Sequence, residues 1–170
     1  DVTEAEVAQH IPRLRRYAQA LTGQREAADD LIQDTLERAW RKRALWQPGT
    51  DLRAWLFTVM HNVHVNRVRA ARPTESLDED GAAAATVATQ VSGQSAETGV
   101  VLSELRVALM RLSEEQRQVI LLVGLEQMSY AEAAGVLDVP IGTVMSRLAR
   151  GREQLRVLLA QGAPVTSGAA

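Results

Sequence analysis

The sequence predicts an all-α protein of two small helical domains joined by a flexible linker, the second domain ending in a helix-turn-helix. Apolar residues recur at helical spacing through most of the chain, and the alternation typical of strands is almost absent. The composition changes abruptly after Pro73, and helical periodicity resumes near Val100. Two short helical patterns then meet at Pro140, where a new helix can begin but the old one cannot continue.

Composition and charge narrow the class of protein. The 170 residues include no cysteine, which excludes disulfides, thiolate zinc sites and cysteine nucleophiles and fits a reducing compartment. No stretch reaches the roughly 18 apolar residues of a membrane span and no signal peptide is present, so we expect a cytoplasmic protein. The net charge is −2, with 12 basic and 9 acidic residues in 1–72, none and 5 in 73–99, and 7 of each in 100–170. Neither end has the basic excess of a protein that binds DNA tightly alone, so a partner is expected to supply affinity.

The first domain, residues 1–72, is expected to begin with two helices. One runs from about Glu4 to Leu21 and stops at Thr22 and Gly23. The other runs from about Arg25 to Arg43, and its expected inward residues are Ala28, Leu31, Ile32, Thr35, Leu36, Ala39 and Trp40. Its exposed face is mostly acidic. Such a face is either a solvated surface, with early carboxylates favoured by the helix dipole, or a surface for a partner.

A loop and a third helix complete this domain. Pro48 and Gly49 predict a loop from Trp46 to Asp51, and Asp51 can cap a helix from about Leu52 to Ala71. The expected inward residues are Trp55, Leu56, Val59, Met60 and Val63; those expected to face elsewhere are Phe57, His61, Asn62, Asn66, Arg67, Arg69 and Arg72. An aromatic-bearing loop beside an Asn- and Arg-rich helix suits single-stranded DNA, because unstacked bases need aromatic faces and amide edges. The alternative is that Trp46, Trp55 and Phe57 fill the core. His61 and His64 have no apparent third ligand, so neither a metal site nor a cofactor is expected.

Residues 73–99 are predicted to be a flexible acidic linker, because they are rich in Ala, Ser, Thr, Gly and acid and lack a sustained apolar stripe. The second domain, residues 100–161, should begin with a helix from near Val100, followed by one capped by Ser113 with Gln116. The tail, residues 162–170, is expected to be disordered.

The stretch from Ser129 to Arg156 has the pattern of a helix-turn-helix. Ser129 and Glu132 form a capping-box pattern, and the first apolar face consists of Tyr130, Ala133, Ala134 and Leu137. The expected inward stripe of the second helix is Ile141, Val144, Leu148 and Leu155. Its outer face is small, polar and basic, as a helix entering a major groove requires. An ordinary helical hairpin with a solvated outer face is the alternative.

Bacterial sigma factors have a −35-reading part that resembles the stretch SYAEAAGVLDVPIGTVMSRLARGREQL. Their core-binding and −10-reading part is similar to DDLIQDTLERAW followed by PGTDLRAWLF. From about residue 10 to 160 the chain resembles the extracytoplasmic-function (ECF) group of small two-domain sigma factors. The resemblance implies a non-enzymatic initiation factor without a small-molecule substrate, which binds core RNA polymerase at the clamp helices of its largest subunits, reads promoter DNA and promotes melting. It also implies control by an anti-sigma factor, commonly at a membrane.

The residue patterns and the resemblance together define three candidate sets. Candidates for the −35 duplex are Gly142, Thr143, Met145, Ser146, Arg147, Ala149, Arg150 and Arg152. Candidates for the −10 element are Trp46, Gly49, Thr50, Phe57, Asn62, Asn66, Arg67 and Arg69. Candidates for core polymerase are Asp30, Gln33, Asp34, Glu37, Arg38 and Arg41. Asn62 is at the family's base-reading position, and Arg150 suits either a guanine edge or a phosphate.

Two other functions stay open on the sequence alone. One is a repressor or activator that binds duplex DNA through the second domain by itself, although no dimerisation helix is obvious. The other is a sigma mimic that binds a regulator without DNA. Asn62, Arg147 and Arg150 argue against the mimic. Met145, where the family often has Lys or Arg, argues slightly for it or alters promoter preference.

Overall fold

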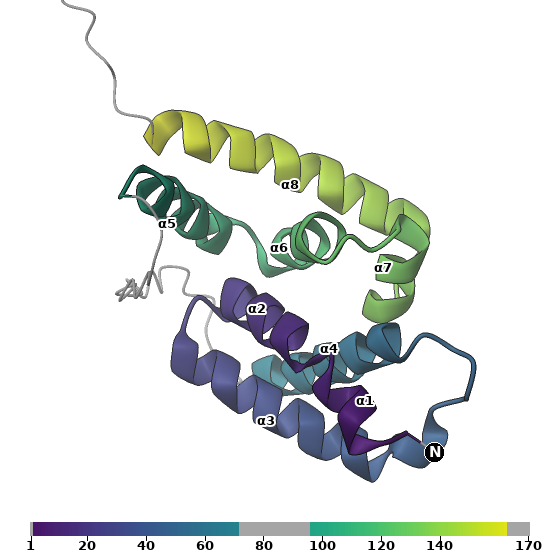
Figure 1. Cartoon of the computed structure of the whole chain (residues 1–170). Helices are drawn as coiled ribbons and strands as arrows, with labels where there is room; N and C mark the ends of the chain where they lie inside the picture. The colour runs from purple at the N-terminus through teal and green to yellow at the C-terminus, as the bar shows by residue number, and fades with distance from the viewer. Residues whose placement is uncertain (1, 72–95, 163–170) are drawn as a thin grey trace, which may run out of the picture.

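The computed structural model describes residues 2–71 and 96–162, and every regular element in these two stretches is helical. The first stretch holds α1 (Glu4–Ala8), α2 (Ile11–Thr22), α3 (Arg25–Arg41), the 3₁₀ turn η1 (Arg43–Leu45) and α4 (Leu52–Ala71). The second holds α5 (Ala96–Arg111), α6 (Glu114–Ile120), the π-helical turn η2 (Leu121–Leu125), α7 (Tyr130–Leu137) and α8 (Ile141–Gly162). The helices form two groups, which confirms the predicted all-α, two-domain fold class. The two groups lie against each other (Figure 1). Most of the predicted linker and nearly all of the predicted tail lie outside the described residues.

The helix expected from Glu4 to Leu21 is divided into α1 and α2, so the prediction of one helix was wrong. Pro12 lies in the first turn of α2, where its missing N–H has no helical partner to lose. In a continuous helix it would remove the hydrogen bond to the carbonyl of Ala8 and its ring would clash there. The hydroxyl of Thr3 caps α1, accepting a hydrogen bond from the N–H of Glu6 at 3.3 Å.

Helix α3 packs between α2 and α4 and ends at Arg41 rather than Arg43. Five of its seven expected inward residues are buried: Ala28, Leu31, Ile32, Thr35 and Ala39. Leu36 is partly buried against the core, but Trp40 is 38% exposed, so its predicted burial was wrong. The guanidinium of Arg43 lies over the Trp40 ring, 4.4 Å from its centroid. This cation–π contact favours the partly exposed position of the ring.

Helix α4 has the predicted bounds, and a carboxylate oxygen of Asp51 caps it by accepting from the N–H of Arg53 at 3.0 Å. The prediction that Phe57 faces outward was wrong, because its side chain is 1% exposed. Its ring lies edge-on to Tyr17 with the centroids 5.3 Å apart. The reason is that α4 is covered on two sides, by α3 within its own domain and by α7 of the other.

The second domain is built around the crossing of α6 and α8. A Cβ atom on Gly151 would lie 2.8 Å from Cδ1 of Ile120, so a side chain there would meet α6. Val144 and Leu148 are buried as predicted, but Ile141 is 50% exposed. Ile141 is the first residue of α8 and precedes the part of the helix that meets α6, so its predicted inward position was wrong. Tyr130, expected on the apolar face of α7, is 38% exposed.

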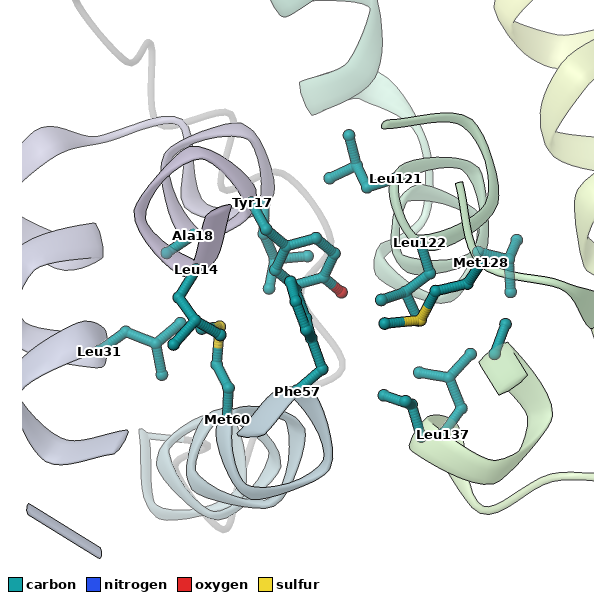
Figure 2. Close-up of a cluster of buried hydrophobic side chains, with 14 of the residues drawn as sticks. Leu14, Tyr17, Ala18, Leu31, Phe57, Met60, Leu121, Leu122, Met128 and Leu137 are labelled. Atoms are coloured by element: carbon teal, nitrogen blue, oxygen red, sulfur yellow. The ribbon is translucent and has the colours of Figure 1, made fainter. Parts of the chain in front are cut away.

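One apolar core runs through both domains (Figure 2). Tyr17 and Phe57 of the first domain lie on the side that faces Leu122 and Met128 of the second. All four side chains are less than 5% exposed, so this part of the boundary between the domains is closely packed.

Candidate nucleic-acid interface

The turn between α7 and α8 has the geometry that the sequence predicted for a helix-turn-helix. The hydroxyl of Ser129 caps α7 by accepting from the N–H of Glu132 at 3.1 Å. Asp138 ends α7 in the left-handed conformation, with φ at 55°, and α8 begins immediately after Pro140. The capping box is half formed in the described residues, because the carboxylate of Glu132 contacts Arg53 of the first domain instead.

Most of the −35 candidates lie on the outer face of α8. Gly142, Met145, Ser146, Ala149, Arg150 and Arg152 are exposed, and Thr143 is half-buried. Arg147 differs, because its guanidinium lies 3.5 Å from the carboxylate of Glu115 on α6 and its side chain is 24% exposed. The sequence predicted that Arg147 is exposed like the others. Its partner, Glu115, is 32 positions away, so no pattern near Arg147 could have predicted the pair.

The −10 candidates lie on α4 and the loop before it. Asn62, Asn66 and Arg69 are exposed on α4. In the loop, Gly49 has a φ of 92° and the hydroxyl of Thr50 donates to the carbonyl of Gln47 at 2.6 Å, which closes a tight turn. Trp46 is half-buried, and its indole N–H has no hydrogen-bond partner among the described residues. Phe57 is the one member of this set that is fully covered.

A groove of about 370 Å³ between α3 and α4 joins two of the candidate sets. From the polymerase set it is lined by Asp34, Glu37, Arg38 and Arg41, and from the −10 set by Asn66 and Arg67. The guanidinium of Arg67 pairs with the carboxylate of Asp34 and donates to the carbonyl of Asp30 at 3.0 Å. Asp30 and Gln33 are exposed on the same helix. A change at Asp34 therefore releases Arg67 as well.

Two arginines of the first domain contact the second domain close to the helix-turn-helix. Arg53 donates to the carbonyl of Glu126 at 3.0 Å and to the carboxylate of Glu132 at 3.2 Å. Arg16 donates to the carboxylate of Glu126 at 3.2 Å. Glu126 is 2% exposed, and its second carboxylate oxygen has no partner in the described part of the chain. These four residues, Arg16, Arg53, Glu126 and Glu132, are called the latch below.

Comparison with known proteins identifies the family. Family models match residues 7–61, as the Sigma2 domain of PhyR, and residues 102–155, as Sigma-70, region 4. The ECF RNA polymerase sigma factor EcfG of Rhodopseudomonas palustris (strain TIE-1) is 40% identical over 149 residues, covering 88% of this chain and 80% of that protein. The chain belongs to the family of ECF RNA polymerase sigma factors. The sigma factor SigL of Mycobacterium tuberculosis is similar too, at 35% identity over 157 residues, 89% of this chain and 85% of that protein.

Solved structures agree with this family. The sigma factor RpoE from Bartonella quintana, in complex with the anti-sigma factor NepR, superposes with a TM-score of 0.72 at 31% identity, covering 94% of this chain and 98% of that chain. CnrH in complex with the cytosolic domain of CnrY has a TM-score of 0.67 at 27% identity, covering 92% and 86%. The region 4 match spans the helix-turn-helix of this sigma factor, so α7 and α8 form its DNA-binding motif.

A buried arginine of this sigma factor bridges its two domains. Arg117 is 8% exposed and donates to the carbonyl of Leu21 at the end of α2 at 2.9 Å. It also donates to three carbonyls at the end of α5: Leu109 at 2.8 Å, Met110 at 3.1 Å and Leu112 at 3.0 Å. Burial lowers the pKa of Arg117 below its ordinary value, with nearby Glu114 opposing the shift. A cation near two helix C-termini is electrostatically favoured, so this residue stabilises both ends at once.

Two histidines lie at the same boundary. His64 of α4 pairs with the carboxylate of Glu114 of α6, and this hydrogen bond is the main reason why the pKa of Glu114 is lowered. Burial lowers the pKa of His61, and the neighbouring His64 lowers it further. In residues 2–71 and 96–162 no three His, Cys, Asp or Glu side chains are grouped so as to hold a metal ion, and no described helix is long and apolar enough to cross a membrane.

Proposed function

We propose that this sigma factor binds core RNA polymerase through the exposed side of α3, captures unpaired −10 bases with α4 and the loop 46–51, and holds the −35 duplex with α8. The observation that carries this proposal is that the candidate residues form two separate surfaces, one on each domain. The groove between α3 and α4 combines acidic and basic side chains of the first domain, while the exposed small, polar and basic face of α8 lies on the second. Binding energy from unpaired bases then drives melting, with polymerase supplying the chemistry.

The packed arrangement of the two domains supports a resting state that opens before promoter binding. Elements at −35 and −10 are separated by about 25 base pairs, or roughly 85 Å at about 3.4 Å per base pair. Helix α4 packs directly against α7, so the two reading domains do not span that distance as described. Residues 72–95 connect them and are long enough, when extended, to reach about 80 Å. We infer that separation of the domains accompanies assembly with polymerase.

The proposed regulator is an anti-sigma factor that holds this closed arrangement. The support is that similar solved sigma factors were captured with NepR and with the cytosolic domain of CnrY. An anchor for this regulator in a membrane, and a cytoplasmic location for the sigma factor, follow from the family resemblance and belong to the same proposal.

The deciding experiment is run-off transcription with purified bacterial core polymerase on a library of promoter sequences. The wild-type chain should enrich promoters with defined −35 and −10 elements. Asp34→Arg should abolish holoenzyme formation, because it reverses a charge in the groove and places a second guanidinium beside Arg67. Asp29→Arg is the matched control, since Asp29 is exposed on the same helix but does not line the groove. Wild-type polymerase affinity in Asp34→Arg would remove α3 as the anchor, provided far-UV circular dichroism shows the variant to be folded.

Two readouts on the same promoters separate the two other functions: duplex binding without polymerase and transcript yield with it. A stand-alone repressor would bind promoter duplex at nanomolar affinity without polymerase at physiological salt. A sigma mimic would bind a regulator but yield no transcript. Residues 7–61 match the Sigma2 domain of PhyR, and PhyR of Bartonella quintana is an anti-anti-sigma factor solved in complex with the anti-sigma factor NepR. This match keeps the mimic as the second candidate.

A further inference from the structure

The beginning of the recognition helix exposes two large apolar side chains. Ile141 is 50% exposed and Met145 is 51% exposed, whereas Val144 and Leu148, which lie beside them on the stripe of α8 that enters the core, are at most 3% exposed. Ile141 and Met145 are four residues apart, so they share one face of α8 and are separated by about 6 Å along its axis. Neither supports the core. A single exposed apolar residue needs no explanation, but two adjoining ones at the end of a DNA-binding helix define a surface with its own chemistry.

This surface carries no free cation in the first two turns of the helix. Arg147 is held by Glu115 of α6, as described above. Gly142 has no side chain, and a Cβ placed there would meet nothing within 4 Å, so the backbone can approach a partner closely. The hydroxyl of Ser146 contacts the carbonyl of Thr143 within the helix at 3.3 Å. Arg150 and Arg152, exposed and without an ion pair in the described residues, begin only in the third turn.

The major groove offers one apolar feature to such a surface, the C5-methyl group of thymine. The N-terminal residues of a recognition helix are the ones that contact base edges, and later cations contact the phosphates. A separation of about 6 Å corresponds to roughly two base-pair steps. A protein-binding strip would continue along the helix, but the next exposed positions are Ala149, Arg150 and Arg152. The change from apolar to basic residues favours duplex DNA over an apolar protein partner.

We infer that Ile141 and Met145 are specificity-determining residues that read thymine methyl groups in the −35 duplex. The inference rests on the proposed contact of α8 with that duplex and names the chemistry that the contact recognises. It adds Ile141, which the sequence pattern assigned to the core. It also gives Met145 a direct part in base reading in place of a guanidinium.

The test uses deoxyuridine, which differs from thymidine only by the missing methyl group. Holoenzyme made with the full chain is bound to the best promoter from the library, with each −35 thymine replaced in turn. Replacement at one or two neighbouring positions should weaken binding about fourfold each, the value for loss of one buried methyl group. Met145→Ala should abolish the effect of deoxyuridine at one position and Ile141→Ala at the other. Met145→Leu keeps an apolar side chain and should retain the effect.

Val157→Ala is the matched control, because Val157 is an exposed apolar residue farther along α8 and should alter neither binding nor the response to deoxyuridine. If every deoxyuridine duplex binds like the thymidine duplex while a scrambled −35 element abolishes binding, methyl reading is refuted and the proposed function stands. If scrambling the −35 element has no effect, the proposed contact of α8 with DNA fails. Loss of methyl sensitivity in Val157→Ala as well would also overturn the inference, since the effect would then not depend on the first two turns.

Discussion

At the scale of single residues, Arg117 has the largest structural role of any charged side chain described. Its guanidinium donates to four backbone carbonyls at the ends of α2 and α5, one of which, that of Leu109, also accepts the N–H of Leu112 at 3.2 Å. Three of the four belong to the second domain and one to the first. The residue therefore stabilises the second domain itself and, through Leu21, the contact between the domains.

We expect Arg117→Met to lower the free energy of unfolding by about 3 kcal/mol or more, because buried carbonyls lose charge-assisted hydrogen bonds without gaining water. Arg117→Lys should be intermediate, since an ammonium group lacks the fork that reaches several acceptors. Urea denaturation followed by circular dichroism measures both. Arg111→Met, an exposed arginine at the end of α5, is the control and should change stability by less than about 0.5 kcal/mol. Equal effects at the two positions would mean that the four contacts contribute nothing specific.

The lowered pKa of His61 predicts that the domains separate at acid pH. The charged and titratable groups that act on it are His64 on α4, Glu114 on α6, Asp138 at the end of α7 and Arg147 on α8. The pKa of His61 is held below its ordinary value of 6.5, so opening takes up a proton as the pH falls below 6.5. The stability of the closed state is then complete above 6.5 and decreases as the pH falls towards the lowered value. The pKa of Glu114 is itself lowered from 4.5, so its contribution is lost only at more acid pH.

Fluorescence energy transfer between the domains measures this opening. The chain has no cysteine, so dyes can be attached at Gln9→Cys and Gln154→Cys, both exposed positions. Transfer should decrease between pH 7.5 and 5.5, and His61→Asn should flatten the decrease. His10→Asn should retain it, because the main charged neighbour of His10 is Asp51 of the same domain. A pH response that survives in His61→Asn would exclude His61 as its source.

At the scale of elements, local signals in the sequence predicted helices well and missed what depends on distant neighbours. The bounds of α4 and the caps at Asp51, Ser113 and Ser129 were predicted correctly, since each depends on a few adjacent residues. The break between α1 and α2 also has a local cause, Pro12. It was missed because the apolar residues keep helical spacing across it. Helix α5 begins at Ala96 rather than near Val100. The early start was missed because Thr98 and Gly99 are poor helix formers, so the local sequence does not indicate a helix there.

Other features had no signal in their own neighbourhood. The π-helical turn η2 and the burial of Phe57 both lie where one domain packs on the other, so they follow from a contact between segments far apart in sequence. The same holds for the candidate sites. The sequence placed the members of the −35 and −10 sets on exposed helices in most cases, but it did not predict the pairs Asp34–Arg67 and Glu115–Arg147.

Two glycines of α8 test how closely the helix packs. At Gly142 a Cβ atom would meet nothing within 4 Å, so Gly142→Ala should raise the free energy of unfolding by up to about 1 kcal/mol through helix propensity alone. At Gly151 a larger side chain would meet Ile120 and Gln116 of α6, so Gly151→Leu should lower it by roughly 1–3 kcal/mol. Chemical denaturation measures both changes. A stabilising Gly151→Leu would show that α6 and α8 separate easily at this crossing.

At the scale of the whole molecule, the latch fixes the closed arrangement by charge. Arg53→Glu should place a second carboxylate beside that of Glu132, and the repulsion should increase the open fraction, seen as lower energy transfer between the labels on residues 9 and 154. Glu132→Arg in the same chain should restore transfer, because the pair is rebuilt with opposite polarity. Arg13→Glu makes the same change of charge at an exposed position on α2 and should leave transfer unchanged. Failure of the second substitution to restore closure would mean that Arg53 acts through its hydrogen bond to the Glu126 carbonyl instead.

The covalent connection through residues 72–95 determines how strong the domain boundary has to be. A tether of this kind holds two domains at an effective concentration on the order of 1 mM, so an interface worth only about 4 kcal/mol between separate molecules keeps half of the chains closed. An interface at this threshold would be displaced by a partner that binds each domain even modestly. Cutting the chain within residues 72–95 would remove the tether, and at micromolar concentration the same interface would then be about a thousandfold too weak to hold the two halves together.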